Sequence, residues 1–273
     1  MFESVSIGDP QFVSLPAPSL HPGGGATAQS EAQSSGLTGV AARLSVKQFG
    51  NEYFADGVFL GAELSETATD GSLLISLGNG TVFDVATLLS GDLNNGEYQG
   101  SVFSQLLTGS TLNNDVILLT GVGTQQGVQI LFATVGLEAP QGNLPTLVTN
   151  YTGELVAFVS NPIEASVDFF LTDLGVDVDF GLGTLTGTAT QGPNGVVGTM
   201  AGTVGSAGVS GTLDLSNVEL DTGRVLTTAD TNFLGKFFGP GAETLSGVLL
   251  GKGQSTANGG QTEALVGAFE TRQ

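Results

Sequence analysis

The side chains that could do chemistry in this chain nearly all carry oxygen. Its 273 residues include 26 Asp and Glu but one histidine, His21, and no cysteine. Without cysteine there is no thiolate nucleophile, no disulfide and no cysteine-ligated metal. A serine or threonine nucleophile needs an adjacent base, and His21 lies in a segment rich in Pro and Gly. The usual nucleophilic triad is therefore excluded.

Pairs of carboxylates are the remaining candidates for acid–base catalysis. Asp177 and Asp179 would project from one face of a strand, about 7 Å apart. They alternate with apolar residues, which favours a solvated outer face. The tripeptide Asp-Thr-Gly at 221–223 matches the aspartic-protease signature, but such sites need two copies and Arg224 interrupts the apolar context. We predict no catalytic residue and no enzyme.

Calcium is the metal that suits oxygen ligands best. Asp92 with Glu97, or Asp168 with Asp173, could contribute to a site assembled from separate loops. The sequence has no EF-hand loop and no glycine-rich nonapeptide repeat. We predict no metal site, and calcium stays open without a supporting motif.

Strands must position these side chains. Runs rich in Val, Leu, Thr and Phe recur from residue 37 onward and predict an all-β fold. An eight-stranded antiparallel barrel is expected, because closure removes exposed edges. Its strands are predicted near 147–158, 164–172, 174–181, 183–190, 195–204, 207–216, 243–252 and 262–270, with 223–229 as a possible ninth. Strands near 73–78, 81–89, 97–103, 114–121 and 126–135 predict a smaller N-terminal β-sheet packed beside the barrel.

Turn dipeptides separate these strands. Asn79-Gly80 and Asn194-Gly195 are hairpin signals, because a type I′ turn needs positive φ at both central residues. Asp56-Gly57 predicts another turn. The expected domains are an extended Pro/Gly/Ser tail at 1–36, a β-sheet region at 37–143 and the barrel at 144–273. The tail could pair with the sheet edge of a neighbouring copy, which makes self-association an open hypothesis.

The charge of the chain limits which classes of partner it can bind and where it is expected to be located. The formal net charge is −20, and no Lys or Arg occurs from Gln48 to Gly223. Nucleic acid is excluded as a partner, because phosphates need cations to replace their counterions. There is no apolar window long enough for a transmembrane helix, and the first ten residues lack the basic start and apolar core of a signal peptide. A strong net charge keeps β proteins soluble, which favours an exported protein.

Three motifs in the C-terminal half resemble one known family. They are Leu144-Pro145-Thr146 through Tyr151-Thr152-Gly153, Val178-Asp179-Phe180-Gly181 with Gly183-Thr184-Leu185-Thr186-Gly187, and Gly235-Lys236-Phe237-Phe238-Gly239-Pro240-Gly241-Ala242-Glu243 followed by Gly247. Their order and spacing resemble the β-barrel domain of transferrin-binding protein B and its bacterial relatives, the transferrin-binding protein-like solute-binding proteins. The motifs also have structural explanations, as glycines for turns and aromatic plugs for a barrel end.

The resemblance implies a binding role at the cell surface or outside a Gram-negative bacterium. Relatives include transferrin-binding and haem-binding proteins, so iron or haem acquisition is the implied use. Haem takes histidine or tyrosine as an axial ligand. With His21 in the tail, Tyr53, Tyr98 and Tyr151 are the candidate ligand-binding residues, and a core or rim position is the alternative for Tyr151. Surface members are typically anchored through an N-terminal cysteine, and its absence favours a released form.

Two functions remain from the sequence. The first is an extracellular, non-catalytic binding protein that captures a small nutrient ligand or a protein partner. Haem stays open as a cofactor, but no sequence motif supports it. The alternative is a structural or interaction component of an extracellular matrix, filament or surface layer, which the low charge density and the Pro/Gly/Ser tail would suit.

Overall fold

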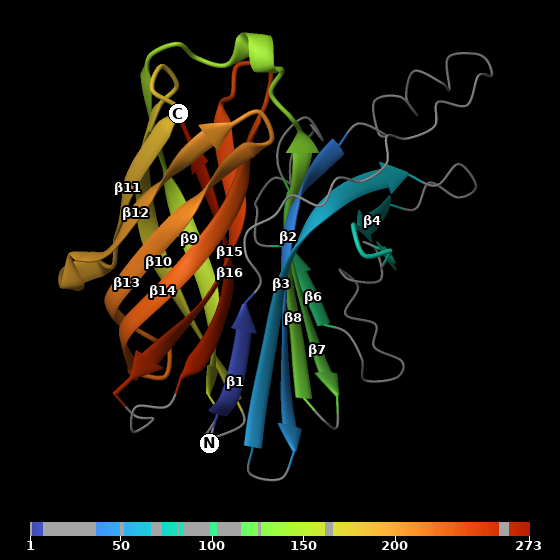
Figure 1. Ribbon diagram of the computed structural model, residues 1–273, viewed down its shortest axis with the longest axis vertical. Coiled ribbons are helices and arrows are strands. Elements are labelled where there is room, and N and C mark those ends of the chain that lie inside the picture. The colour runs from blue at the N-terminus through green and yellow to red at the C-terminus, as the bar shows by residue number, and fades with distance from the viewer. Residues whose placement is uncertain are drawn as a thin grey trace.

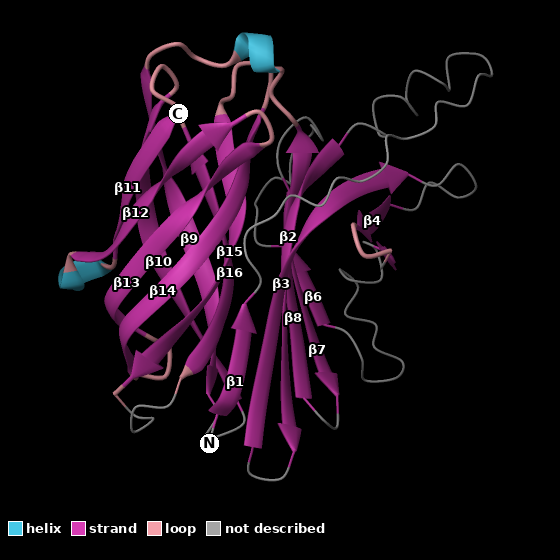
Figure 2. Cartoon of the chain, viewed as in Figure 1, coloured by secondary structure: helices cyan, strands magenta, loops and turns pink. Residues whose placement is uncertain are grey.

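A computed structural model of the chain describes residues 2–7, 37–49, 52–66, 73–80, 82–84, 99–102, 116–124, 127–161, 166–256 and 262–273 (Figure 1). Most of these residues are in strands, and two short 3-10 helices, η2 (Gln141–Asn143) and η3 (Gly192–Asn194), lie in connections (Figure 2). The strands form a closed barrel and an open sheet that lie side by side. The predicted all-β class, an eight-stranded antiparallel barrel beside an N-terminal sheet, is confirmed.

The barrel occupies the C-terminal half of the chain. Its strands are β9 (Val148–Asn161), β10 (Ser166–Asp179), β11 (Thr184–Thr190), β12 (Val196–Gly205), β13 (Gly208–Glu219), β14 (Val225–Phe238), β15 (Thr244–Ser255) and β16 (Glu263–Arg272). Each strand pairs antiparallel with the next, and β16 returns to pair with β9. Closure leaves the barrel with no open edge along most of its wall.

The division of the chain into barrel strands differs from the prediction at two places. The strands predicted at 164–172 and 174–181 are the single strand β10, because inward apolar residues continue through this region without a turn. The segment at 223–229, predicted as a possible ninth strand, is the beginning of β14, which continues to Phe238. One strand was thus predicted as two and another was largely missed, so the predicted total of eight strands is still correct.

The N-terminal sheet has the order β5-β4-β3-β2-β8-β7-β6, with β1 parallel to β3. Its strands are β1 (Phe2–Ile7), β2 (Leu37–Phe49), β3 (Glu52–Glu66), β4 (Leu73–Leu77), β5 (Val82–Asp84), β6 (Gln99–Val102), β7 (Val116–Thr124) and β8 (Gly127–Leu137). The long strands β2 and β3 were not predicted. The turn predicted at Asp56-Gly57 is wrong, since both residues lie inside β3, between β1 and β2.

β1 falls in the segment expected as an extended tail. Its residues pair with β3 from Phe2 opposite Tyr53 to Ile7 opposite Gly57. The rest of that segment, 8–36, lies outside the described residues. A turn is present at Asn79-Gly80, where Gly80 has a φ of 84°, but Asn79 does not have positive φ, so the turn is not of the expected type I′.

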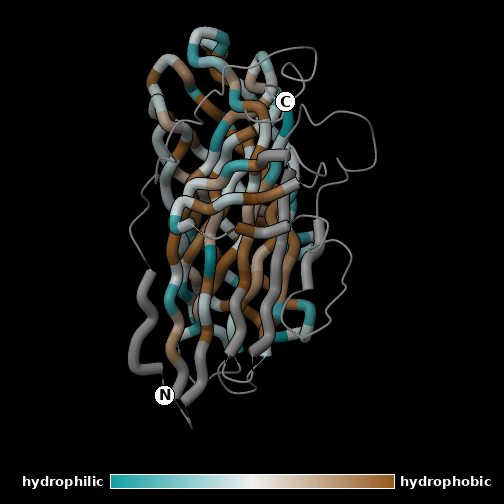
Figure 3. Tube along the Cα trace, turned by 90° about the vertical axis from the view of Figure 1, so that its right-hand side faces the viewer, coloured by the Kyte–Doolittle hydropathy of each residue, from teal (hydrophilic) through white to brown (hydrophobic). Residues whose placement is uncertain are grey.

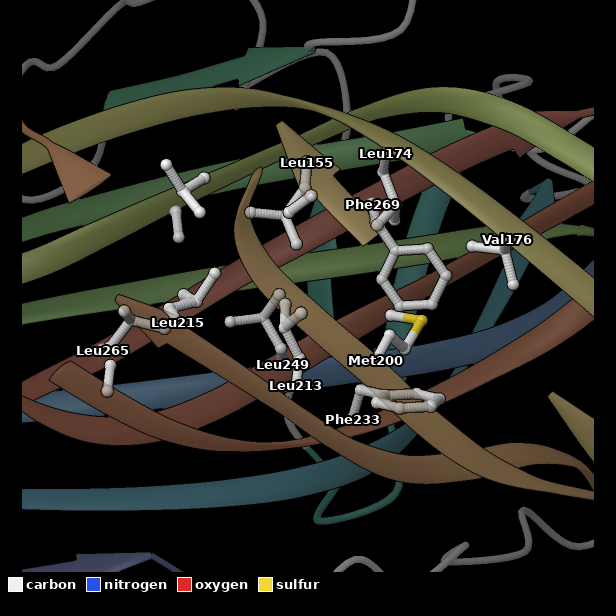
Figure 4. Close-up of a cluster of buried hydrophobic side chains, with 14 of the residues drawn as sticks. Leu155, Leu174, Val176, Met200, Leu213, Leu215, Phe233, Leu249, Leu265 and Phe269 are labelled. Carbon is white, nitrogen blue, oxygen red and sulfur yellow. The ribbon is translucent and has the colours of Figure 1, made fainter. Parts of the chain in front are cut away.

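Alternate residues of the barrel strands point inward and fill its interior. Figure 4 shows a part of this cluster, in which side chains from several strands converge: Leu155, Leu174, Val176, Met200, Leu213, Leu215, Phe233, Leu249, Leu265 and Phe269. Phe233 and Phe269 pack edge to face with ring centroids 5.9 Å apart. A Cβ at Gly202 would lie 2.9 Å from Phe233 Cζ, and one at Gly247 would lie 2.6 Å from Phe269 Cζ. Small residues thus make room for large rings, and the interior is a packed core.

One face of the sheet packs on the outer wall of the barrel. Buried residues of β2 and β8, among them Leu44 and Phe132, form one cluster with outward residues of β14, β15 and β16 such as Leu234. The Thr134 and Ser246 hydroxyl oxygens, 2.8 Å apart, share a hydrogen bond inside this interface. Seen from the sheet side, apolar residues recur along the sheet strands (Figure 3). The sheet therefore covers one side of the barrel and leaves its opposite side and both ends outside the interface.

Candidate functional site

The linker between β8 and β9 crosses one end of the barrel (Figure 1). We call this end the linker end; it comprises residues 138–148, 180–183, 205–208 and 239–243. Gln141 Nε2 donates to the Ser206 carbonyl oxygen at 2.9 Å. Asn143 Nδ2 donates to the Pro240 carbonyl oxygen at 3.1 Å. One short segment thus ties together the turns β12–β13 and β14–β15, and all three motifs of the sequence reach this end.

Tyr151 plugs the linker end from within. Its side chain is 1% exposed, and its ring packs against that of Phe237 with centroids 5.9 Å apart. The hydroxyl donates to the Ala242 carbonyl oxygen at 2.8 Å and accepts from Gln273 Nε2 at 3.2 Å. Burial raises the pKa of Tyr151 to about 12; the Glu243 carboxylate adds to this rise, and the Gln273 hydrogen bond opposes it. A phenolate is therefore disfavoured at this position.

The turn between β14 and β15 supplies the oxygen that Tyr151 binds. Gly239 and Ala242 both have positive φ, 85° and 60°. The positive φ of Gly239 is a backbone conformation that glycine adopts without steric cost, so glycine is favoured there. Glu243 Oε2 in turn accepts from the Gly241 N–H at 2.9 Å. The third motif therefore builds a tight turn that closes the barrel.

The turn between β10 and β11 presents apolar side chains to solvent. Asp179 Oδ1 accepts from the Leu182 N–H at 2.9 Å, and Gly183 has a φ of 67°. Leu182 at its tip is 77% exposed, and Leu147 on the adjacent linker is 76% exposed. A Cβ at Gly181 would lie 3.7 Å from the Thr146 carbonyl oxygen, so the two loops touch. The linker end is closed within and apolar at its outer tip.

A buried ionic cluster closes the opposite end of the barrel. The Arg224 guanidinium pairs with the carboxylates of Asp168 and Glu263. Arg224 Nη2 also donates to Ser255 Oγ at 2.8 Å, and Ser255 Oγ donates to Glu263 Oε1 at 2.6 Å. Asp168 and Glu263 are 2% and 0% exposed. The cluster brings together inward polar groups of β10, β15, β16 and the turn before β14, although Arg224 Nε is buried there without a hydrogen-bond partner among the described residues.

The carboxylate pairs weighed from the sequence do not converge. Asp177 is exposed on the outer wall and accepts from Asn150 Nδ2, while Asp179 caps its turn. Asp168 points into the barrel and Asp173 is exposed on the outer face, so the pair considered for calcium is separated by the strand itself. Asp221 Oδ1 accepts from the Phe169 N–H at 3.0 Å in the turn before β14, where it seals the barrel wall.

The other predicted residues are placed only in part. Tyr53 lies in β3, and nothing is described of its side chain. His21, Tyr98 and the pair Asp92 and Glu97 lie outside the described residues. Ligand binding by Tyr53 and Tyr98 stays a prediction. Tyr151 has both hydroxyl partners inside the protein, and any ligand role for it stays a prediction that would require this end to open.

Sequence reasoning missed the exposed leucines and the role of Arg224. Leu182 stands between two glycines at a hairpin tip, where a polar residue is usual, and that contrast is a readable signal. Arg224 is the first basic residue after a long stretch without any. A lone cation among many carboxylates could have been predicted to hold a buried acid.

Within the described ranges, no group of three or more His, Cys, Asp and Glu side chains is arranged to hold a metal ion. None of the described helices has the length and apolar character to cross a bilayer. A shallow open groove on the outer wall crosses β13, β14 and β15, and its lining is mostly polar: Thr212, Asp214, Asp230, Thr231, Asn232, Gly251 and Lys252. The polar side chains that line this groove suit polar groups.

Comparisons with solved structures give likenesses at low identity. A variant of the vaccine antigen transferrin binding protein B from Haemophilus parasuis Hp5 is 19% identical, with a TM-score of 0.46, over 86% of this chain and 45% of that one. Isotype 1 transferrin binding protein B from serogroup B Neisseria meningitidis is 12% identical, with a TM-score of 0.45, over 86% of this chain and 44% of that one. A surface lipoprotein is 11% identical, with a TM-score of 0.43, over 85% of this chain and 98% of that one. No curated protein sequence matches this chain significantly.

The chain spans less than half the length of the two transferrin binding protein B structures. The family model described as the C-lobe and N-lobe β barrels of transferrin-binding protein B matches residues 150–273. That range begins inside β9 and includes all other barrel strands, and the resemblance predicted from the motifs is confirmed over it. Over residues 150–273 this chain is therefore similar to the β barrels of transferrin-binding protein B.

Proposed function

We propose that this protein is a non-catalytic binding protein, outside a bacterial cell or on its surface, that captures a protein partner through the linker end of its barrel. The observation that carries the proposal is the contrast at this end. The barrel is filled and closed within, while Leu147 and Leu182 are exposed on two neighbouring loops of this end. Exposed apolar side chains on neighbouring loops are available for a macromolecular contact.

The packed interior argues against a small ligand inside the barrel. Small barrels of eight strands either fill with side chains or hold one ligand, and here large rings occupy the centre. A haem would need space and an axial ligand, and the Tyr151 hydroxyl already has two protein partners. Capture of an iron-carrying protein is therefore favoured over capture of free haem.

The family supports the same choice. The matched family is named for transferrin binding, and the similar structures include transferrin binding protein B from two bacteria. This chain corresponds to part of those proteins only. We infer that iron acquisition from a carrier protein is its use, and that the polar groups at the linker end maintain the loops that make the contact.

The test measures binding of the purified chain to iron-loaded transferrin, lactoferrin and haemoglobin by surface plasmon resonance, with haem followed by its absorbance. We expect one carrier to bind. The double variant Leu147→Asp/Leu182→Asp should weaken that binding at least tenfold. Val196→Asp is the matched control, because Val196 is 61% exposed and lies at the start of β12, away from the linker end. Absence of binding to every carrier would contradict iron acquisition, and equal loss in the control would contradict the assignment to these loops.

The alternative function, a structural component of an extracellular assembly, is favoured by one observation. β1 adds to β3 as a parallel strand, and a strand added in this way within one chain can be exchanged between copies. Sedimentation of the purified protein separates the two proposals. Regular polymers that disappear when residues 1–7 are deleted support the assembly, and a monomer at all concentrations contradicts it.

A further inference from the structure

An apolar strip leaves the sheet–barrel interface and continues onto the open wall of the barrel. We call it the β10 strip; it comprises Val156, Phe158, Val167, Phe169 and Leu171, all on the outer face of β9 and β10. The ring of Phe158 lies 5.7 Å from that of buried Phe132 and 6.1 Å from that of Phe169. Phe169 is 43% exposed and Leu171 is 50% exposed. The strip is thus a direct extension of a buried interface into solvent.

The strand register explains this continuity. Phe169 faces Phe158 across β10 and β9, and Phe158 faces Val266 of β16, which is fully buried under the sheet. Leu171 likewise faces Val156, in register with buried Ala268. Two apolar rows therefore cross β10, β9 and β16, and the sheet covers only one part of each.

A third row, next to these two, consists of carboxylates. Asp173 of β10, Glu154 of β9 and Glu270 of β16 are in register on three neighbouring strands. Like charges directly opposite each other destabilise a sheet. Arg272 neutralises Glu270 through a bond of 2.7 Å. Within the described part of the chain, Asp173 and Glu154 form no ion pair.

The open wall here is suited to side-chain contacts and not to strand addition. β11 pairs with β10 only from Asp173 onward, so the strip lies beside the part of β10 that β11 does not reach. There the Asp221 N–H donates to the Phe169 carbonyl oxygen at 2.9 Å, and Asp221 Oδ1 accepts from the Phe169 N–H. This turn blocks the edge of β10, as natural sheets often do.

We propose that the β10 strip and its carboxylate row form a second docking surface, for a protein segment that carries Lys or Arg beside apolar side chains. An apolar centre with a charged rim is the usual composition of a protein interface. The three carboxylates are not grouped to hold a metal ion. A second copy of this chain, an anionic membrane and a nucleic acid would each bring more negative charge to a chain of net charge −20. A partner segment with cationic and apolar side chains matches both the β10 strip and the carboxylate row. This surface is distinct from the linker end.

The probe is a synthetic peptide of alternating Leu and Lys, with a Leu/Glu peptide of equal length as the charge control. Binding to the full chain is measured by fluorescence anisotropy at 0.15 M NaCl. We expect the Leu/Lys peptide to bind and the Leu/Glu peptide not to bind. Leu171→Asp and the double variant Glu154→Gln/Asp173→Asn should each raise the Kd at least tenfold.

The matched control for the carboxylates is Asp214→Asn/Asp230→Asn. These two exposed acids are also in register with each other, on β13 and β14, and their removal changes the net charge by the same amount. The control should change the Kd less than threefold. Equal loss in both double variants would overturn the proposal, because the peptide would then follow net charge alone. The proposal would also be overturned if the wild-type chain did not bind the Leu/Lys peptide. It would be overturned as well if the wild type bound calcium and Glu154→Gln/Asp173→Asn did not.

Two further measurements keep the outcomes distinct. The variant Leu147→Asp/Leu182→Asp should retain peptide binding, so failure of the linker-end proposal and failure of this one are separable. Unchanged thermal unfolding of Leu171→Asp shows that a loss of binding is not a loss of fold.

Discussion

Single polar residues close both ends of this barrel, and they do so with opposite chemistry. Tyr151 closes the linker end with a neutral hydroxyl between two partners. Arg224 closes the other end with a charge shared between two buried carboxylates. Tyr151 and Asp168, which the sequence offers as candidates for ligand or metal binding, here make a hydrogen bond and an ion pair within the protein at the two ends of a packed core.

Tyr151→Phe tests the linker end at the level of one hydrogen bond. We expect a loss of about 1 kcal/mol in the free energy of unfolding, measured by urea denaturation. The chain has three tyrosines and no tryptophan, so absorbance at 295 nm isolates tyrosine ionisation. The wild-type minus variant difference should titrate near the raised pKa of about 12.

The raised pKa of Tyr151 also predicts how the free energy of unfolding falls at alkaline pH. The folded-state pKa of Tyr151 is about 12 against an ordinary value of 10.0, so the folded state retains a proton that the unfolded state releases. Its contribution to stability is complete below pH 10 and is lost as the pH rises towards 12. In Tyr151→Phe this part of the decline should disappear. A difference titration near pH 10 would contradict the burial.

Arg224→Met tests the ionic cluster. Removing the guanidinium leaves two buried carboxylates without their counter-charge, and such changes cost about 3–5 kcal/mol. Adding Asp168→Asn and Glu263→Gln should restore most of this loss in thermal unfolding. The control Arg272→Met removes a half-exposed partner and should cost less than about 1 kcal/mol. Equal losses in the two single variants would contradict the assignment.

At the scale of elements, the strands show where local sequence signals are overridden. The hairpin signal at Asn79-Gly80 is a turn in the structure, whereas Asp56-Gly57 is extended inside β3 because strands pair with it on both sides. β10 likewise continues where a break was expected, since its inward residues match the interior of the barrel over its full length. The barrel could be predicted from motif order and alternation, but strand boundaries depend on partners that are distant in sequence.

Gly153→Ala tests close strand packing in β9. A Cβ there would lie 2.0 Å from the main-chain oxygen of Glu270, so the β9–β16 pairing must shift. We expect a loss of about 3 kcal/mol, at the upper end for overpacking. Gly175→Ala in β10 is the control, because a Cβ there meets nothing within 4 Å. It should be neutral or stabilise by about 0.5 kcal/mol; similar losses at both positions would contradict the register.

At the scale of the whole molecule, burial and charge act in opposite directions. One apolar interface joins the sheet to the barrel, while the net charge of −20 repels across the surface. Composition could predict this repulsion. It could not predict where the face of β2 and β8 would lie on the barrel, because the covered outward residues, such as Leu234, Val248 and Val266, lie on strands whose other outward residues are polar.

Salt should therefore stabilise the protein. Raising NaCl from about 0.02 M to about 0.5 M shortens the Debye length severalfold and screens surface repulsion. We expect the Tm to rise by several degrees in thermal unfolding followed by circular dichroism. The Arg224 cluster is buried and should be little affected, so Arg224→Met should show a similar rise. A Tm that stays constant or falls as the salt concentration rises would show that repulsion between surface charges is not the dominant electrostatic effect on stability.

The pairing of β16 with β9 has a kinetic consequence. These strands are the last and the first of the barrel, and their register joins Arg272 to Thr152. Contacts between segments so distant in the chain form slowly, because the loop between them must be closed first. The barrel wall cannot be completed until its final strand has arrived. Until then the unfinished barrel presents two free strand edges, which could pair with another chain.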